Sequence, residues 1–413
     1  MTKNTADNPG IRLPWAGKLV RIEQVEEELA SLWKLSADNM RTGQNINVRT
    51  SVLNLVICAP DIESAQRASV VLRDLSSTHI ARVALLILDR SDTTASLSTW
   101  ITLRCFSVIS DLMRHCFEQM TLLATGAAIR SVANIIQPLL KPDLPVYLWW
   151  LGDPPDDDST FNSLVELSSR VILVSTSFFN PEQDIQTLAA ILQTSPNCAL
   201  SDLNWGRLTP WRQLLVQFFD VPDYRPYLAG IDSIEIEHAA EPLAMPMRNE
   251  QGDVSPNPTR ALLLAGWLKA RLGWILSEST HQHDTASGSY HWLLERSAST
   301  TRLLSPTQGK ASKQATITIR PRVQSEIRPG SICLVRLVSH VENKRATFTI
   351  NRDEDPNLVL TSVELSQETR PHRTVSMAAS QKESELLHDE LEITGHDHLF
   401  EQTLQEVAEL LEN

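Results

Sequence analysis

The chain has 413 residues, of which 42% are hydrophobic, and it carries a formal net charge of -13 with a pI near 5.4. A chain of this length can bury two cores of ordinary domain size. The negative charge repels nucleic-acid backbones and anionic lipid surfaces, because these are negative themselves. We therefore predict no nucleic acid and no membrane among the partners.

The sequence also indicates a cytoplasmic location. The first twenty residues lack the hydrophobic segment of a secretory signal. The most apolar run, Ala261–Leu268, has eight residues, whereas about twenty are needed to span a bilayer. The five cysteines are far apart, unlike the dense disulfide framework of a small secreted domain. They are Cys58, Cys105, Cys116, Cys198 and Cys333.

Residues 1–44 are predicted to form a flexible lead with one helix around Glu23–Leu35. Residues 45–199 are predicted to form an N-terminal α/β domain, because apolar strand patterns alternate with helical spacing. This alternation predicts a doubly wound, mainly parallel sheet. The predicted strands are Ser51–Cys58, Ala81–Leu88, Pro145–Leu151 and Val171–Ser175, and the predicted helices are Ile62–Leu75 (with Asp61 as N-cap), Ala127–Leu140, Phe161–Leu167 and Glu182–Gln193.

A hairpin is inserted into this pattern. Trp100–Phe106 and Cys116–Leu123 show strand alternation and are separated by about nine residues. Cys105 lies at the end of the first strand and Cys116 at the start of the second, so the two can face each other. If their Cα atoms approach within about 7 Å they can form a disulfide, which in a reducing cytosol would act as a redox switch. The alternative is a pair of small buried hydrophobic residues.

Residues 200–413 are predicted to form a C-terminal α+β domain with an antiparallel sheet, ending in acidic helices. The predicted strands are Ile231–Glu237, Tyr290–Glu295, Ala315–Arg320, Ile332–Val338, Ala346–Asn351 and Leu358–Val363. The predicted helices are Trp205–Phe219, Ala261–Leu276, Glu383–Leu391 and Leu399–Leu411. The predicted loops are Glu241–Pro258, His281–Gly288 and Ser305–Lys313.

The last residues of the sequence are strongly acidic. Between Gln381 and Asn413 there are ten Asp or Glu residues and one Lys. Such a charge pattern is typical of a solvated helical face. The alternative is a docking surface for a basic partner.

The sequence lacks the motifs that mark common catalytic and cofactor sites. Neither GxGxxG nor GxxxxGK[ST] occurs, and no GxSxG nucleophile motif is present. The His281-x-His283 and His396-x-His398 pairs have no nearby cysteine pair, and Asp156–Asp158 lacks the alternate spacing of a calcium loop. We therefore predict no catalytic residue, no cofactor and no metal, and a protein that acts by binding another protein.

Asn204–Gln213 is the densest group of unusual residues in the chain. Tryptophan and arginine are the types enriched at protein-binding hot spots, so this segment is the candidate partner-binding site. The alternative is that the tryptophans anchor a core and the arginines pair with carboxylates. The candidate residues are Trp205, Arg207, Thr209, Trp211 and Arg212.

Four stretches, in the same order and with the same domain layout, resemble the OpcA family of glucose-6-phosphate dehydrogenase assembly proteins. The resemblance extends from about Asn45 to the C-terminus. It rests on Arg104–Phe106 with Cys116–Leu122, Leu144–Asp153, Ser201–Arg212 and Leu262–Trp274.

The resemblance implies a function. Members of the family bind glucose-6-phosphate dehydrogenase and promote its active oligomer, and they contribute no catalytic residues. Members from photosynthetic bacteria are thiol-responsive, which draws attention to Cys105 and Cys116, with a thioredoxin as the expected reductant. Glu392–Phe400 contains no cysteine, so regulation through a C-terminal cysteine pair should be absent or relocated here.

A second hypothesis belongs to another class. The N-terminal α/β domain could hold a sugar phosphate, as a binding protein or weak enzyme. That function would need cationic side chains at the carboxyl ends of the strands. The predicted strand ends are poor in cations: Ala59-Pro60, Asp89-Arg90, Gly152-Asp153 and Ser175-Thr176.

Overall fold

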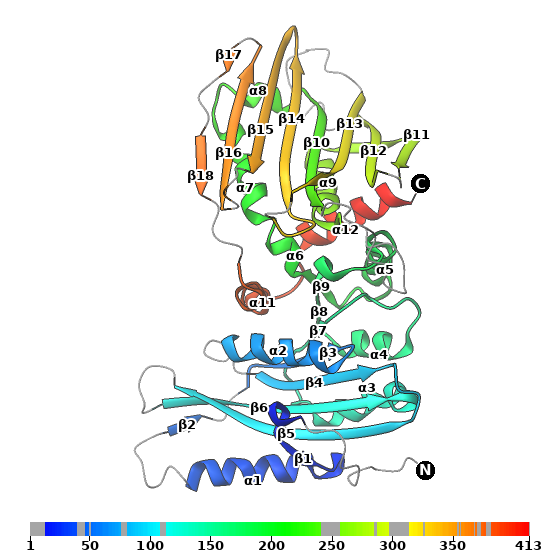
Figure 1. The fold of residues 1–413 in the computed structure, drawn as a ribbon, viewed down its shortest axis with the longest axis vertical. Helices are drawn as coiled ribbons and strands as arrows, with labels where there is room; N and C mark the ends of the chain where they lie inside the picture. The colour runs from blue at the N-terminus through cyan, green and yellow to red at the C-terminus, as the bar shows by residue number, and fades with distance from the viewer. Residues whose placement is uncertain are drawn as a thin grey trace. The chain divides into compact units, whose positions relative to one another are not determined.

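A computed structural model describes most of the chain (Figure 1). The described residues are 13–38, 46–48, 51–75, 81–107, 113–240, 257–284, 287–296, 314–324, 327–352, 355, 357–366, 368–369, 373–376 and 381–412. No helix within these ranges is both long and apolar enough to cross a bilayer.

The chain divides into two compact units, and each unit is built from three separate segments of the sequence. The first unit consists of Met1–Val174, Ile191–Leu203 and Lys382–Asp397. The second consists of Ser175–Ala190, Asn204–Gln381 and His398–Asn413. The chain passes from the first unit to the second after Leu203, four residues beyond the predicted domain boundary at residue 199. The prediction did not include the other points at which the chain passes between the units.

Among the described residues of the first unit, nine strands form one sheet with the order β1-β5-β6-β4-β3-β7-β8-β9, and β2 pairs with β6. The pairs from β6 through β9 are parallel, whereas β5 is antiparallel to β6 and to β1. The predicted doubly wound sheet with an inserted hairpin is therefore confirmed. The strands are β1 (Lys18–Val20), β2 (Ile46–Val48), β3 (Leu53–Ala59), β4 (Ala81–Asp89), β5 (Ser96–Ser107), β6 (Met113–Thr125), β7 (Val146–Trp150), β8 (Arg170–Leu173) and β9 (Ala199–Asp202).

Helices cover both faces of this sheet. Arg104 on β5 donates a hydrogen bond of 2.9 Å to Ser69 of α2, while Glu118 on β6 accepts one from Trp33 of α1. Neighbouring strand positions point to opposite faces, and Arg104 is one residue from Leu103, the partner of Glu118. Helices α1 and α2 therefore lie on opposite faces, below and above the sheet in Figure 1. The helices are α1 (Val25–Asp38), α2 (Ile62–Leu75), α3 (Val132–Ile136), α4 (Ser159–Leu167) and α11 (Glu383–Glu392).

Among the described residues of the second unit, nine strands form a mainly antiparallel sheet, ordered β11-β12-β13-β10-β14-β15-β16-β17 with β18 paired to β16. The exception is β10 with β13, which is parallel. This agrees with the predicted C-terminal α+β fold. The strands are β10 (Ile231–Ala240), β11 (Trp274–Asp284), β12 (Ser289–Arg296), β13 (Gln314–Val323), β14 (Ile332–Val341), β15 (Lys344–Arg352), β16 (Leu358–Leu365), β17 (Glu368–Thr369) and β18 (Arg373–Ser376).

One row of paired, buried side chains crosses five strands of the second sheet and sets its inner face. At one end of the row, Trp292 donates a hydrogen bond of 2.8 Å to the carbonyl of Leu410 in α12. At the other end, the Phe348 ring packs against aromatic rings of α7. The register places the helices of this unit on the inner face. The row is Trp292, Ile317, Ile234, Leu337 and Phe348. The helices of the unit include α7 (Thr209–Asp220), α8 (Arg225–Leu228), α9 (Thr259–Leu272) and α12 (His398–Leu411). Helix α5 (Pro181–Thr194) begins in this unit.

Two predicted boundaries in the second unit are wrong for local reasons. The helix predicted over Ala261–Leu276 ends at Leu272, because Gly273 adopts a left-handed conformation that caps it and β11 begins at the next residue. The loop predicted over His281–Gly288 is largely strand, because β11 extends to Asp284 and pairs with β12. Ser305–Lys313 and most of Glu241–Pro258 lie outside the described residues.

A third correction concerns the first unit. The helix predicted over Ala127–Leu140 is three short pieces: the 3₁₀ segments Gly126–Ser131 and Gln137–Leu139 with α3 between them. Pro138 removes a backbone donor, which is incompatible with a continuous helix through this position.

Helices α9 and α12 approach closely at Gly266. A Cβ atom at Gly266 would lie 2.4 Å from Cγ2 of Val407 and 2.9 Å from the carbonyl oxygen of Thr403. We predict that Gly266→Val lowers the stability by about 1–3 kcal/mol through overpacking. Thermal unfolding followed by circular dichroism measures this. Ala270→Val, at a half-buried position on the same helix, is the control, and equal effects of the two substitutions would contradict the prediction.

A buried histidine makes the second unit sensitive to acid. His238 on β10 is 1% exposed, and burial lowers its pKa to about 4 from the ordinary value of 6.5. Because the unfolded chain binds this proton at higher pH than the folded one, stability falls as the pH drops from 6.5 to about 4, by about 3 kcal/mol.

The test compares the thermal midpoints of the wild type and of His238→Phe between pH 7 and pH 4. The wild type should lose more of its midpoint on acidification than the variant, since the carboxylates titrate equally in both. If the thermal midpoints of the two proteins fall equally between pH 7 and pH 4, His238 does not cause the acid sensitivity.

Candidate functional site

The strand order of the first sheet reverses between β3 and β7, which is the topological switch point of a doubly wound sheet. From β3 the chain adds β4 and then β6 on one side, and it returns to add β7, β8 and β9 on the other. In doubly wound sheets, ligands bind at the carboxyl ends of the strands at such a switch point, with phosphate at the N-terminus of the first helix. A nucleotide or sugar phosphate would therefore bind at the carboxyl ends of β3 and β7.

The residues at the switch point do not fit a phosphate. The turn from β3 into α2 contains Pro60 and Asp61 and no glycine. The Asp61 carboxylate already accepts hydrogen bonds from Ser64, at 2.7 Å from its backbone nitrogen and at 3.1 Å from its hydroxyl. The predicted N-cap is thus confirmed. It places a negative charge where a phosphate would otherwise bind, and like charges repel.

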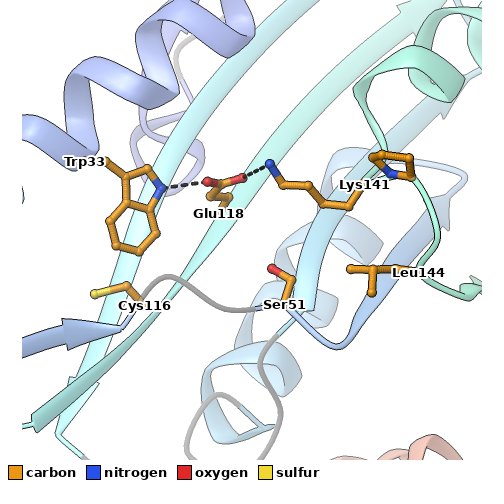
Figure 2. A pocket seen from close by; sticks show the side chains of 7 residues that line it. Trp33, Ser51, Cys116, Glu118, Lys141 and Leu144 are labelled. Carbon is orange, nitrogen blue, oxygen red and sulfur yellow. Dashed lines mark hydrogen bonds and ion pairs between the residues drawn. The ribbon is translucent and has the colours of Figure 1, made fainter.

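A pocket of about 360 Å³ lies at the opposite, amino-terminal edge of the same strands. We call it the amino-edge pocket. Figure 2 shows the indole of Trp33 and the amine of Lys141 approaching the Glu118 carboxylate from opposite sides. The lining residues are Trp33, Ser51, Cys116, Glu118, Lys141, Pro142 and Leu144.

Glu118 is the centre of a buried charge network beside this pocket. Its carboxylate accepts a hydrogen bond of 2.6 Å from Nε1 of Trp33 and lies 3.1 Å from the guanidinium of Arg82 and 3.9 Å from Nζ of Lys141. The side chains of Arg82 and Glu118 are only 1% and 3% exposed. Arg82 also pairs with Glu26 of α1. Helix α1 is thus bound to the sheet through these contacts and through the pair of Glu28 with Lys18 of β1, as well as by apolar packing.

Asn54 fixes the loop that forms the other wall of the pocket. It lies within β3 and is fully buried. Its side-chain amide donates to the carbonyls of Lys141 and Leu144 at 3.0 and 3.3 Å and accepts from the backbone nitrogen of Lys141 at 2.8 Å. Sequence reasoning did not identify Asn54, Arg82 or Glu118 as site residues. The available signal was a polar side chain within an otherwise apolar strand.

The two hairpin cysteines are joined in the structure. Cys105 and Cys116 are directly opposite each other in the β5–β6 register, with a Cα–Cα distance of 4.0 Å, and form a disulfide. Cys116 is 1% exposed and lines the amino-edge pocket, whereas Cys105 is half-buried. The predicted pairing across the hairpin is therefore present.

The other three cysteines are buried and form no disulfide. Burial raises the pKa of Cys58 far above its usual range and that of Cys333 to about 11. A thiol needs its thiolate form to react, so these two are poor nucleophiles at neutral pH. Cys105 and Cys116 are the pair placed for thiol exchange.

The predicted partner-binding segment has buried rings and half-buried polar side chains. Trp205 and Trp211 are 3% and 2% exposed. The Arg212 guanidinium lies 3.5 Å from the centre of the Trp205 ring, and that ring is 5.8 Å from Phe400. Arg207 and Thr209 are half-buried. The tryptophans therefore anchor the second unit, as in the structural alternative for this segment, while Arg207, Thr209 and Arg212 keep part of their surface exposed.

The acidic C-terminal residues are partly packed inward. In α12, Glu406 and Glu409 form ion pairs with Lys269 of α9, whose side chain is 1% exposed. In α11, burial raises the pKa of Glu390 to about 6, against a hydrogen bond to Ser201 and the charge of Arg170. Both sequence alternatives, a solvated face and a docking surface, overlooked this role in packing.

In the predicted histidine pair at residues 281 and 283, the described side chain is that of His283. His283 stacks on Tyr290 with a centroid distance of 4.2 Å and lies 3.2 Å from the Glu182 carboxylate. Within the described ranges, no group of three or more His, Cys, Asp or Glu side chains could hold a metal ion.

The outer face of the second sheet is hollowed and polar. The hollow has a volume of about 590 Å³ and is lined by arginine, threonine and asparagine side chains among others. Glu235 pairs with Arg320 at 3.2 Å and with Arg336 at 2.6 Å across neighbouring strands. Such cross-strand pairs are typical of a sheet face in contact with water.

Comparison with known families decides the relationship of the chain. Residues 72–190 match the model described as the glucose-6-phosphate dehydrogenase subunit N-terminal domain, and residues 198–404 match the model of its C-terminal domain. Together these matches cover most of the chain. The protein belongs to the OpcA family.

Cyanobacterial relatives agree. The protein named OpcA in Synechocystis sp. is 35% identical over 167 residues, which is 40% of this chain and 32% of the relative. The one in Nostoc punctiforme is 27% identical over 295 residues, 71% of this chain and 57% of the relative. The matched part of the chain thus spans between a third and just over half of the length of these relatives.

Two solved structures show low similarity to the chain. A dehydrogenase from Chromobacterium violaceum has 12% identity and a TM-score of 0.44, covering 87% of this chain and 94% of its own. Levoglucosan dehydrogenase in complex with NADH has 10% identity and a TM-score of 0.46, covering 88% and 94%. At these values the likeness does not inform the ligand or reaction of this protein.

The charge network beside the amino-edge pocket should be important for stability. We predict that Glu118→Ala destabilises the protein by about 3 kcal/mol or more, because it leaves the buried Arg82 with fewer compensating charges and Trp33 without its acceptor. Glu63→Ala removes an exposed ion pair with Arg67 and should change stability by less than about 0.5 kcal/mol. Thermal unfolding of both variants provides the comparison, and a Glu118→Ala effect as small as that of the control would contradict the prediction.

Proposed function

We propose that this protein is a non-catalytic assembly factor and allosteric activator of glucose-6-phosphate dehydrogenase in the oxidative pentose phosphate pathway, acting in the cytoplasm. The observation that carries the proposal is the match of both halves of the chain to the two domains of a glucose-6-phosphate dehydrogenase subunit. The carboxylate of Asp61 at the switch point supports a binding role for the first unit rather than catalysis on a phosphorylated substrate.

An activator must bind the active form of its target more tightly than the inactive form. A tenfold shift between the two forms requires about 1.4 kcal/mol of differential affinity. A few polar contacts at an interface supply this amount.

We assign the partner contact to the polar side chains of the segment between Trp205 and Arg212. The two indole rings hold the segment in place, and the guanidinium of Arg212 lies over one of them. Arginine side chains positioned by such packing lose little entropy when they bind, which favours affinity. Arg207, Thr209 and Arg212 are the proposed contacts, with Trp205 and Trp211 as their support.

We further propose that the response of the dehydrogenase depends on the redox state of the Cys105–Cys116 pair, with a thioredoxin as reductant. The support is the disulfide at this position and the burial of the three remaining cysteines. No C-terminal cysteine pair is needed for such a response.

The test is co-purification with the cognate dehydrogenase, followed by its oligomer size and its substrate saturation curve with and without this protein. We expect co-elution, a larger oligomer and a shift of the saturation curve to lower substrate concentration. Absence of both co-elution and any kinetic change would overturn the proposal. Calorimetry with sugar phosphates and NADP on this protein alone should show no binding.

Variants locate the contact. Arg207→Ala should weaken binding of the dehydrogenase about tenfold, which corresponds to about 1.4 kcal/mol. Arg225→Ala, an exposed arginine of the same unit outside the segment, should leave the affinity unchanged. Equal affinities of the two variants would remove the segment from the interface.

A further inference from the structure

The Cys105–Cys116 disulfide is placed next to the contacts that fix helix α1. Successive residues of a strand alternate between faces, so Cys116, Glu118 and Met120 lie on one face of β6. Glu118 on this face accepts the hydrogen bond from Trp33 of α1. Cys116 and Trp33 line the same pocket. The disulfide is therefore two residues from the group that binds the helix.

Helix α1 is attached to the sheet by apolar packing and by charged contacts. Val25 and Leu29 are fully buried, and Glu26 pairs with Arg82, which itself lies 3.1 Å from Glu118. The contacts of Glu26 and Trp33 with the sheet thus end on the same buried pair, while Glu28 of the helix pairs separately with Lys18 of β1. Any movement of β6 at Glu118 reaches both contacts.

The disulfide restrains this part of β6. It joins β6 to β5 near the end of the hairpin, where the described parts of the two strands extend only two or three residues further, to Ser107 and from Met113. A cross-link that closes a short loop limits the separation of the two strand ends. When it is cut, the ends keep their ladder hydrogen bonds and packing but lose the covalent link, and local opening becomes easier.

We propose that Cys105–Cys116 is a thiol-exchange site whose reduction loosens α1 from the sheet and exposes the amino-edge pocket. The proposal rests on the proposed function for its biological use, since it describes how a redox signal changes the surface of this protein. The coupling itself is a property of the first unit alone.

The chemistry is a dithiol–disulfide exchange with a protein dithiol. Its thiolate attacks the sulfur of the half-buried Cys105, the S–S bond breaks, and Cys116 leaves as a thiolate that takes up a proton. The second thiol of the reductant then attacks the mixed disulfide and releases Cys105 as a thiol. Two electrons and two protons pass from the reductant, which leaves as a disulfide.

Hydrogen exchange on the full-length protein, oxidised or reduced with a small dithiol, tests the proposal. After reduction, the backbone amides of residues 25–38 should exchange about tenfold faster, as expected for a loss of about 1.4 kcal/mol of local stability. The amides of α9, in the other unit, should be unaffected and serve as internal control. Thiol labelling confirms that Cys105 and Cys116 have been reduced.

Two variants make the result specific. The double variant Cys105→Ser/Cys116→Ser should show the fast exchange of α1 under both conditions. Trp33→Phe keeps an aromatic ring but removes the N–H donor, so its α1 should exchange faster than that of the wild type even when oxidised. If both cysteines are reduced and the exchange of α1 does not change, the coupling is refuted.

The two proposals fail in different ways. If α1 responds to reduction while the dehydrogenase is activated equally by oxidised and reduced protein, the coupling stands and its regulatory use is overturned. If the dehydrogenase ignores this protein altogether, the assembly function fails regardless of the exchange data.

Discussion

Three buried cations organise the two units. Arg82, Arg170 and Lys269 each have side chains only 1% exposed. A desolvated charge without compensation costs several kcal/mol, so each of them requires acceptors from elsewhere in the chain. Each of the three sets of acceptors includes a carboxylate on a helix that is distant in sequence. Arg82 pairs with Glu26 of α1, Arg170 lies near Glu390 and bonds to the carbonyl of Ile393 after α11, and Lys269 pairs with Glu406 and Glu409 of α12.

This constraint gives the acidic C-terminal residues a structural role. The composition alone predicted a solvated face or a docking surface, because a segment rich in carboxylates is usually exposed to water. The buried partners of these carboxylates are single basic residues: Arg170 starts an apolar run, and Lys269 lies inside one. A lysine in the middle of an apolar helix was visible in the sequence. Its partner, more than a hundred residues away, was not.

Local patterns predicted most of the fold, and non-local pairing explains the errors. The hairpin, the N-cap at Asp61 and the helix α12 follow from alternation, capping and helical spacing over a few residues. The strand through His281 could not be predicted in this way, because β12 stabilises it from across the sheet. The amino-edge pocket was missed for the same reason: Trp33 and Glu118 are 85 positions apart. The Cys105–Cys116 pair was accessible to sequence reasoning because a hairpin brings nearby residues together.

The division of the last two helices between the units bears on the order of events during synthesis. Residues 382–397, with α11, complete the first unit, and residues from 398 onward, with α12, complete the second. Arg170 on β8 and Lys269 on α9 are therefore synthesised before the carboxylates of α11 and α12 that lie beside them. Domains ordinarily fold one after another as they emerge, whereas each of these units includes a segment that is made after residue 381.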